Sequence, residues 1–201
     1  MPKIERAILS CYDKDGLVEF AKGLREFNIE LISTEGTHAA LSDAGVEVCG
    51  IGDFTGVREM MNGRVKSLHP KVHAGLLGIR DNKLHVEEMQ TYQCQWIDLV
   101  VVNLHPIDDL LGDSALTTEE IIEQVDIGGM AMVRSAAKNH RYVGVVVNPE
   151  RYPSVLHDLR AHEGSLPFKT RFRLAQEAFA CTAQYDKTLA EYLQSCEPPE
   201  E

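Results

Sequence analysis

The sequence lacks the marks of a secreted or membrane-bound protein. It has no signal peptide and no apolar run near the roughly 20 residues that a membrane-spanning helix needs. Its five cysteines are odd in number and include no Cys-x-x-Cys pair, so nothing indicates a disulfide framework. We therefore predict a cytoplasmic protein whose thiols are reduced.

Positive charge is also scarce. The chain has 20 lysines and arginines against 31 aspartates and glutamates, which gives a net charge of −11 at pH 7. Nucleic acids and anionic membranes are bound mainly by cationic surfaces, so neither is a predicted partner. A small anionic ligand is still compatible with this charge, provided that a few cations converge on it.

Short apolar runs alternate with helical patterns along most of the chain. The runs that predict strands are residues 6–10, 29–33, 46–48, 97–104 and 142–147. The patterns that predict helices are residues 17–24, 39–41, 84–92 and 130–139, with a capping box at Thr117 and Glu120 before a further short helix. Such alternation is typical of an α/β fold with a parallel sheet and right-handed crossovers.

The C-terminal region differs from the rest of the chain. From Pro167 to about Ser195 one helical pattern predicts a helix about 42 Å long, at roughly 1.5 Å per residue. That length exceeds what a small sheet needs. We therefore divide the chain into a domain at 1–166, a helical extension at 167–196 that packs on the same domain or on a partner, and a tail at 197–201.

Two early loops carry hydroxyl groups and a lysine. They follow the first two predicted strands, and each leads into a helix whose free amides favour an anion. The candidate phosphate ligands are Ser10, Lys14, Thr34, Gly36 and Thr37. Ser10 and Thr37 are equally explained as simple helix caps. Neither loop matches GxGxxG or GxxxxGK[ST], so the fingerprints of dinucleotide and nucleoside triphosphate sites are absent.

A basic stretch from Gly63 to Gly75 stands out in this acidic chain. Because Pro70 cannot sit inside a helix or donate to a sheet, we interpret the stretch as a loop with cationic donors, or as a solvated charged loop. His69 and His73 are four residues apart, but Pro70 lies between them and would spoil a helical metal pair. We predict no metal site here.

Several stretches match one family in order and at closely similar spacing. They are Ser10 to Gly16, Gly63 to Pro70, Gln124 to Gly129 and Ala136 to His140, followed by Phe179, Thr182, Ala183, Tyr185 and Asp186. On these residues the chain resembles the IMP cyclohydrolase domain of the bifunctional AICAR transformylase/IMP cyclohydrolases of purine biosynthesis. The resemblance runs from residue 5 to about 195. It implies a methylglyoxal synthase-like fold, a three-layer αβα sandwich with a mostly parallel sheet.

The resemblance implies ring closure of formyl-AICAR to IMP with loss of water, without a metal or cofactor. That reaction needs a base for a weakly nucleophilic amide and donors for the oxygen that leaves. Lys66 would be the cationic donor, Asp126 would orient or deprotonate the amide, and Lys138 would keep Asp126 ionised. From the residues alone, Asp126 is equally a helix cap and Lys138 a solvated cation at a helix end.

The resemblance also places the nucleotide. Its phosphate is expected on the two early loops, and its base is expected to be surrounded by Arg64, Ser67, Asn103, Ile127 and Gly128. Three residues depart from the family pattern. His105 stands where a catalytic tyrosine is usual, and it can donate a proton or hydrogen bond with a different pH dependence. Tyr12 replaces a small hydroxyl residue used on the phosphate, and Glu35 replaces a glycine beside it.

The main alternative is a nucleotide- or anion-sensing module of the same fold that performs no turnover. The departures at His105 and Glu35 would suit such a sensor, and a methylglyoxal synthase-like lyase is a further alternative. We favour the enzyme because a sensor has no need of Lys66, Asp126 and Lys138 together. Family proteins continue into a transformylase domain, so this chain is either a stand-alone cyclohydrolase or part of a longer protein. The candidate partners are the nucleotide substrate, a second copy of the chain and a separate transformylase.

Overall fold

A computed structural model of the protein describes residues 3–112 and 115–196, so the predicted tail at 197–201 lies outside the described residues. Its centre is a five-stranded, all-parallel sheet in the order β3-β2-β1-β4-β5. The strands are β1 (Arg6–Cys11), β2 (Glu30–Ser33), β3 (Cys49–Gly50), β4 (Leu99–Asn103) and β5 (Gly144–Val146). All of them end at one edge, here called the carboxyl end of the sheet, and begin at the opposite edge, the amino end.

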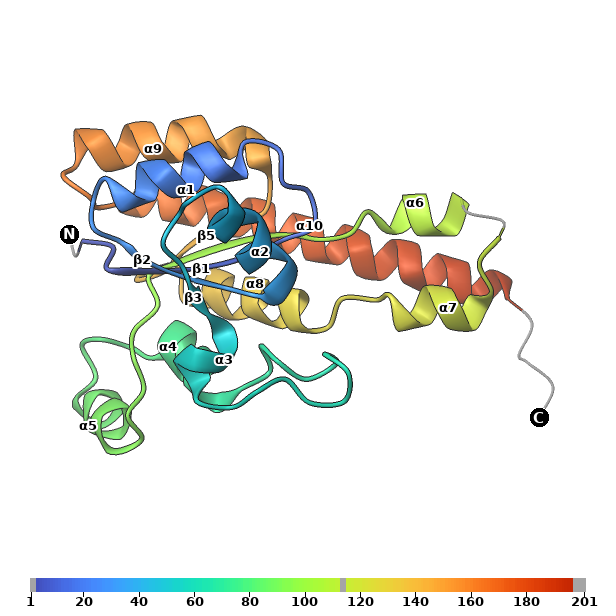
Figure 1. Ribbon diagram of the computed structural model, residues 1–201, viewed down its shortest axis with the longest axis horizontal. Coiled ribbons are helices and arrows are strands. Elements are labelled where there is room, and N and C mark those ends of the chain that lie inside the picture. The colour runs from blue at the N-terminus through green and yellow to red at the C-terminus, as the bar shows by residue number, and fades with distance from the viewer. Residues whose placement is uncertain (1–2, 113–114, 197–201) are drawn as a thin grey trace.

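Helices cover both faces of the sheet, which makes three layers (Figure 1). On one face lie α1 (Leu17–Arg25), α2 (Glu35–Asp43) and α9 (Tyr152–Ala161). On the other lie α3 (Ile51–Thr55), α4 (Pro70–Leu77) and α8 (Gly128–Lys138), and α10 (Phe168–Ser195) packs on α8 and β5. The remaining elements are α5 (Lys83–Thr91), α6 (Ile107–Gly112), α7 (Thr118–Glu123) and the 3₁₀ turn Pro149–Arg151. The predicted three-layer α/β fold with a long C-terminal helix is confirmed.

The central strands show why apolar runs form this sheet. In β4, Leu99 and Val101 belong to the core beneath α1 and α9, whereas Val100 and Val102 belong to the core beneath α4 and α8. Because successive side chains point to opposite faces, a strand covered on both sides must be apolar at every position. The same alternation places Ile8 of β1 in the second core.

Local chemistry moves two predicted boundaries. The third strand is Cys49–Gly50 and not residues 46–48, because the Val46 amide donates to the Leu41 carbonyl and closes the end of α2. The predicted loop at 63–75 becomes helix α4 at Pro70. Pro70 occupies the first helical turn, where an amide is not needed, and the His69 ring caps that turn by accepting from the Lys71 amide at 3.1 Å.

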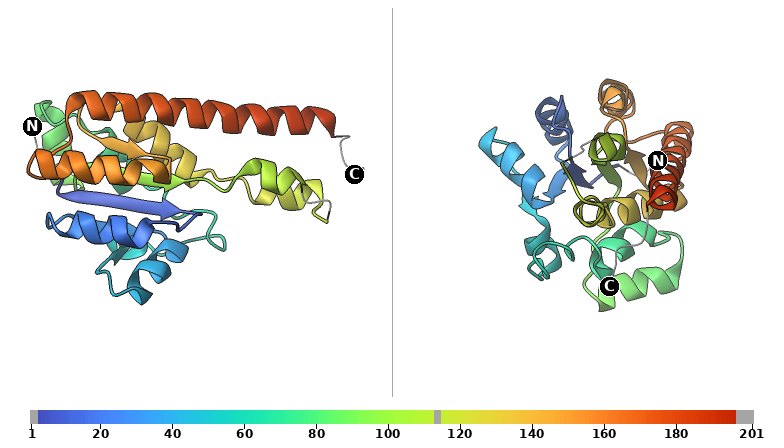
Figure 2. Two further views of the ribbon diagram at one scale, coloured as in Figure 1. Left: turned by 90° about the horizontal axis from the view of Figure 1, so that it is seen from above. Right: turned by 90° about the vertical axis from the view of Figure 1, so that its right-hand side faces the viewer.

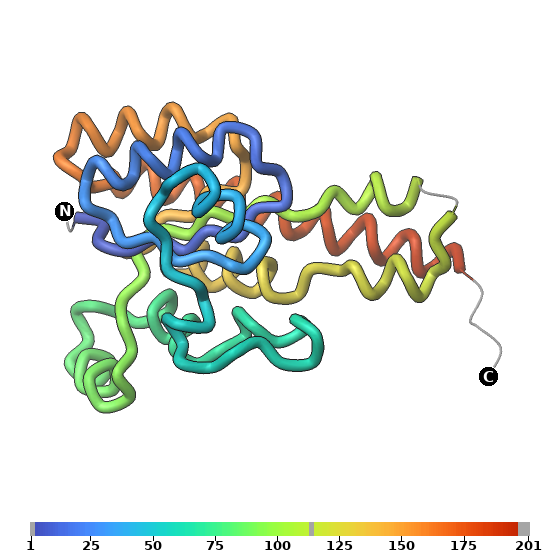
Figure 3. The backbone as a smooth tube through the Cα atoms, viewed as in Figure 1, coloured from blue at the N-terminus to red at the C-terminus, as the bar shows by residue number. Residues whose placement is uncertain are grey.

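Helix α10 is a single 28-residue helix. Its first half packs beside the sheet, and its second half extends past the carboxyl end alongside α6 and α7 (Figures 1 and 2). The backbone trace in Figure 3 shows the same projecting second half of α10, here called the arm. The predicted capping box of Thr117 and Glu120 is confirmed at the start of α7, and the Tyr192 hydroxyl lies 3.2 Å from the Thr118 hydroxyl. None of the described helices is long and apolar enough to cross a membrane.

Charged side chains close the amino end of the sheet. The Asp98 carboxylate accepts from the Arg6 amide at 3.1 Å and from the Arg80 guanidinium at 2.6 Å. The guanidinium in turn lies 5.1 Å from the ring centre of Trp96 and 5.5 Å from that of Tyr142. Asp98 and Arg80 are mostly buried and pair with each other, and the Arg80 guanidinium is also held by two aromatic faces.

Candidate functional site at the carboxyl end of the sheet

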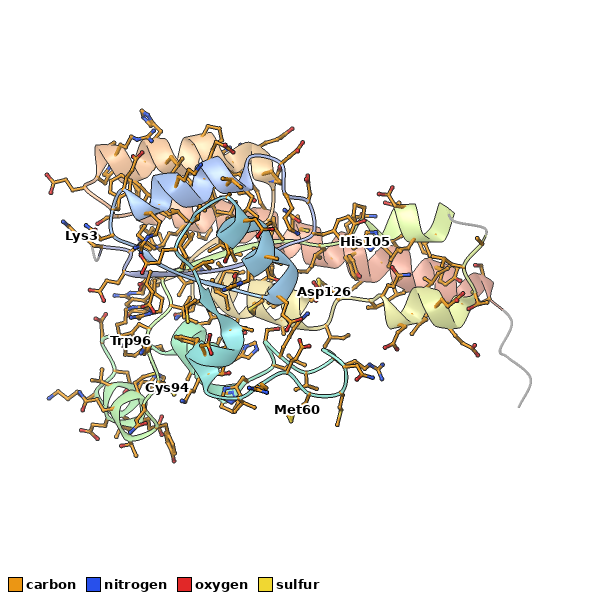
Figure 4. The ribbon with its side chains drawn as sticks, in the orientation of Figure 1. Lys3, Met60, Cys94, Trp96, His105 and Asp126 are labelled. Carbon is orange, nitrogen blue, oxygen red and sulfur yellow. The ribbon has the colours of Figure 1, made fainter. Side chains whose placement is uncertain are left out.

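A cavity of about 750 Å³ opens at the carboxyl ends of β1 and β4. Open parallel sheets bind ligands at this end, and the volume suits a nucleotide-sized molecule. Most of the predicted site residues line the cavity, and they are Ser10, Tyr12, Arg64, Lys66, Ser67, Asn103, His105, Asp126, Ile127 and Gly128. Figure 4 shows His105 and Asp126 at this end, where the arm begins, and Lys3 and Trp96 at the other.

Asp126 is held on both sides by α8 and α10. One carboxylate oxygen accepts from the Gly129 amide at 2.7 Å, and the Asp126 amide lies 3.1 Å from the Tyr185 hydroxyl. A Cβ atom at Gly129 would lie 2.3 Å from the second carboxylate oxygen, so a larger residue would force the carboxylate to shift. Asp126 is therefore a helix cap, as one interpretation of the sequence held, and it also lines the cavity.

The basic loop touches the first turn of α8 at Ser67. The Ser67 side chain is buried, and a Cβ atom at Gly128 would lie 2.2 Å from its hydroxyl oxygen. Gly128 therefore allows a close approach that a larger residue would disturb. This contact fixes the loop that carries Lys66 against the helix that carries Asp126.

The two cations of the loop differ in their surroundings. Arg64 pairs with Glu123 at 3.1 Å, but both side chains are more than half exposed, so solvent screens the pair strongly. Lys66 is exposed on the cavity wall and has no ion-pair partner among the described residues. Both cations are therefore available to an anionic ligand.

His105 lies against Tyr12. The two ring centres are 3.9 Å apart, and the ring planes differ by 16°. The resemblance implies a place for Tyr12 beside the substrate phosphate, but this stack directs the Tyr12 ring to the loop after β4. Both residues line the cavity.

Asn103 holds the loop after β1. Its side-chain oxygen accepts from the Asp13 amide at 2.8 Å, and its side-chain nitrogen donates to the Asp13 carbonyl at 3.0 Å. The Tyr12 amide also donates to the Asn103 carbonyl at 3.2 Å. The amide predicted to face the base is thus engaged with backbone, so Asn103 positions residues 12 and 13.

The predicted phosphate ligands divide between the cavity and the backbone. Thr34 occupies the N-cap position of α2, and its hydroxyl donates to the Ser10 hydroxyl at 2.9 Å. The expectation that Thr37 is the cap is wrong. Thr37 is buried, and its hydroxyl accepts from the Cys11 amide at 2.9 Å and donates to the Cys11 carbonyl at 3.2 Å. Thr37 therefore anchors the end of β1.

Lys14 and Gly36 lie outside the cavity lining. The Lys14 ammonium donates to the carbonyls of Cys11 and Tyr12, the latter at 3.0 Å, and so is folded back onto its own loop. Gly36 is exposed in the first turn of α2. Glu35 lines a second cavity, of about 460 Å³, with Asp53 and other residues of α2 and α3.

Lys138 does not reach Asp126. It is the last residue of α8, an 11-residue helix that begins at Gly128, so about 15 Å of helix separates the two ends at roughly 1.5 Å per residue. Lys138 is exposed and does not line the cavity. Within one copy of the chain Lys138 and Asp126 therefore do not meet, and the role that the resemblance implies for Lys138 stays a prediction.

The sequence did not point to the apolar part of the cavity. This part is lined by Ile122 of α7, by Val125 in the segment after α7, and by Leu189 and Leu193 of α10. Leu189 and Leu193 fit the helical pattern of α10, but only the projection of that helix past the sheet brings them to the cavity.

Cys11 also lines the cavity, as the last residue of β1. Its thiol lies 3.6 Å from the Val101 carbonyl and 3.8 Å from the Tyr152 hydroxyl. Burial raises the pKa of the Cys11 thiol, and burial likewise raises the pKa of Tyr152. A buried thiol that stays protonated is a poor nucleophile, so Cys11 is structural.

Comparison with known proteins decides the family. The profile of the MGS-like domain matches residues 16–131, more than half of the chain. The chain belongs to the MGS-like domain family. Within this family, the profile of the AICARFT/IMPCHase bienzyme matches residues 136–201, so the predicted resemblance is confirmed.

Curated relatives support this assignment. The chain is 48% identical over 195 residues to the bifunctional purine biosynthesis protein PurH of Neisseria meningitidis serogroup A, which covers 97% of this chain and 37% of that protein. It is 47% identical over 193 residues to PurH of Magnetococcus marinus, covering 96% of this chain and 36% of the relative. The chain therefore spans little more than a third of the length of these relatives.

A solved structure has the same fold over nearly the whole chain. The crystal structure of ForH superimposes with a TM-score of 0.81 at 36% sequence identity. The match covers 94% of this chain and 98% of that one. This MGS-like domain and the C-terminal helix thus occur together in a second chain of similar extent.

Proposed function

We propose that this MGS-like chain is an IMP cyclohydrolase, which closes the ring of formyl-AICAR to give IMP and water. The observation that carries the proposal is the cavity at the carboxyl end, which collects Lys66, His105 and Asp126 from three separate segments. The proposal is also supported by the 48% sequence identity between this chain and PurH over 97% of the chain. Those relatives are bifunctional proteins of purine biosynthesis by name.

The reaction forms one carbon–nitrogen bond and releases one water. The carboxamide nitrogen of the substrate attacks the formamido carbon and loses one of its two protons, and the formamido nitrogen loses its single proton. The formyl oxygen takes up two protons and leaves as water. Asp126 has one carboxylate oxygen committed to the Gly129 amide, and the other is free to orient or accept a proton from the amide. Lys66 supplies positive charge and protons where the formyl oxygen becomes negative.

His105 supplies a second donor on the cavity wall. An imidazole that is protonated donates a proton or a hydrogen bond, as the phenol of the family pattern would. The substrate phosphate is expected at the start of α2, beside the Ser10 and Thr34 hydroxyls, where helix amides favour an anion. Arg64 can contact the base by leaving its weak surface pair with Glu123.

Turnover of formyl-AICAR by the purified chain tests this function. We expect IMP to accumulate, measured by its ultraviolet absorbance and by mass spectrometry of the product. A Lys66→Ala variant serves as the control for catalysis by a contaminating enzyme. Binding of IMP without any turnover by the wild type would contradict the enzyme and support a nucleotide-sensing module instead.

A further inference from the structure

Tyr12 is a large side chain in an exposed position at the cavity. Its side chain is 55% exposed, so burial of the ring contributes little to folding. The ring nevertheless lies nearly parallel to the His105 imidazole, with 3.9 Å between ring centres and 16° between planes. Stacked aromatic rings attract one another and favour defined offsets, so each ring restricts the orientation of the other.

The backbone beneath this pair is fixed on both sides. The Tyr12 amide donates to the Asn103 carbonyl at 3.2 Å, and the Asn103 side chain pairs with both backbone groups of Asp13. The Tyr12 carbonyl accepts from the Lys14 ammonium at 3.0 Å. Residue 12 is therefore held in register with the end of β4, two residues before His105.

The His105 ring has few other restraints. Among the residues that the structure describes, its side chain forms no hydrogen bond, and the Tyr12 ring is its one aromatic neighbour. An imidazole acts as a proton donor only when its nitrogen points at the reacting oxygen. The orientation of His105 thus depends on the face of Tyr12.

We propose that Tyr12 is a positioning residue that orients His105 toward the reacting group, and not a ligand of the substrate phosphate. This inference rests on the proposed cyclohydrolase function for its kinetic consequence. The stack itself is a property of the free protein. The phenol ring does the positioning, so its hydroxyl is dispensable for this role.

Two substitutions separate the ring from its hydroxyl. Tyr12→Phe keeps the stack, and we expect kcat for formyl-AICAR to fall by less than about threefold. Tyr12→Leu removes the ring, and we expect kcat to fall by about tenfold or more with KM nearly unchanged, because misplaced catalytic groups lose rate and not ground-state binding. Tyr92→Leu is the matched control, since Tyr92 is 69% exposed at the C-cap of the distant helix α5 and should keep wild-type kinetics.

Nuclear magnetic resonance of the free protein gives a readout that needs no turnover. The ring current of Tyr12 should move the carbon-bound imidazole protons of His105 upfield in the wild type and in Tyr12→Phe. In Tyr12→Leu these signals should return downfield, and a His105→Gln variant assigns them. Tyr92→Leu should leave them unchanged.

Three outcomes would overturn the inference. The first is His105 signals that do not move in Tyr12→Leu, which would exclude the stack even if the wild type proves inactive. The second is a rise in KM with unchanged kcat in either Tyr12 variant, the sign of a phosphate ligand. The third is an equal loss of kcat in Tyr12→Phe and Tyr12→Leu, which would assign the role to the hydroxyl. An inactive wild type with the expected ring-current shifts would contradict the proposed function but retain the orienting stack.

Discussion

The two ends of the parallel sheet use charged residues in opposite ways. At the amino end, Asp98 and Arg80 are mostly buried and pair at 2.6 Å, and the buried guanidinium of Arg171 donates to three backbone carbonyls. At the carboxyl end, Lys66 is exposed on a cavity wall without an ion-pair partner among the described residues, and the Arg64 pair is exposed.

This difference separates charges that hold the fold from charges that are available to a ligand. A buried charge that loses its partner costs folding free energy, so substitutions of the charged residues at the amino end should lower the stability of the protein. An exposed cation on a cavity wall adds little to stability, so substitutions of the cations at the carboxyl end should lower the activity and leave the stability nearly unchanged. Substitutions at the two ends of the sheet and in the helices beside it should therefore differ in whether they lower stability or activity.

Removal of Asp98 should have the largest effect on stability. Asp98→Ala leaves the Arg80 guanidinium without its carboxylate and two backbone amides without an acceptor. We expect a loss of about 3–5 kcal/mol in the free energy of unfolding, measured with urea. Glu26→Ala is the control, because Glu26 pairs with Arg160 on the surface at 3.4 Å and should cost under about 1 kcal/mol. Similar losses in both variants would contradict the proposed contrast.

Removal of Lys66 should have the largest effect on activity. Lys66→Ala should lower kcat about 10²-fold or more, because loss of one preorganised donor to a developing oxyanion costs that much. Its melting temperature should match the wild type. Lys71→Ala is the control, since Lys71 follows in the same basic stretch but does not line the cavity. Near-normal turnover of Lys66→Ala would remove Lys66 from the mechanism.

The contact between Gly128 and Ser67 can be broken and then restored. A Cβ atom at Gly128 would lie 2.2 Å from the Ser67 hydroxyl oxygen but 3.6 Å from its Cβ atom, an ordinary contact distance. We expect Gly128→Ala to cost about 1–3 kcal/mol of stability through overpacking. Adding Ser67→Ala should recover most of that loss in urea unfolding. A double variant no more stable than Gly128→Ala would show that the strain lies elsewhere.

His73 should contribute the smallest effect, as a pH dependence of stability. Burial lowers the pKa of His73 from its ordinary value of 6.5, while its ring nitrogen lies 3.0 Å from the Ser135 hydroxyl. Below that ordinary value the unfolded chain binds a proton that the folded chain resists, so stability should fall as the pH falls through 6.5. His73→Gln should reduce this slope, whereas His157→Gln, at an exposed position of α9, should not. An unchanged slope in His73→Gln would exclude the contribution.

Much of the fold follows from the sequence because the central strands are covered on both faces. The apolar runs at β1 and β4 have no other reason to be continuous, and alternation with helices then implies a parallel sheet. The sequence does not predict helix α4, because proline is common both in loops and in the first turn of a helix. Helix α9 was missed although Tyr152, Val155 and Leu159 lie on one buried face.

The candidate site was predictable where its residues follow strands or glycines. Ser10 and Asn103 lie at or beside strand ends that a parallel sheet brings together, and Gly128 marks a close approach. Side-chain direction was not predictable. Lys14 and Thr37 carry the right groups at the right edge, yet their polar atoms bond to the backbone. The distance of Lys138 from Asp126 within one copy was not predictable either, because a motif records residue types, whereas the length of α8 fixes the distance between its ends.

A crystal structure with bound IMP tests the central claim most directly. We expect the nucleotide to occupy the cavity at the carboxyl end, with its six-membered ring within hydrogen-bond distance of Lys66 and Asp126 and with its phosphate beside Ser10 and the start of α2. The His105 ring should remain stacked on Tyr12 in the complex. Density for IMP in the cavity between α2 and α3, or at the amino end of the sheet, would contradict the account.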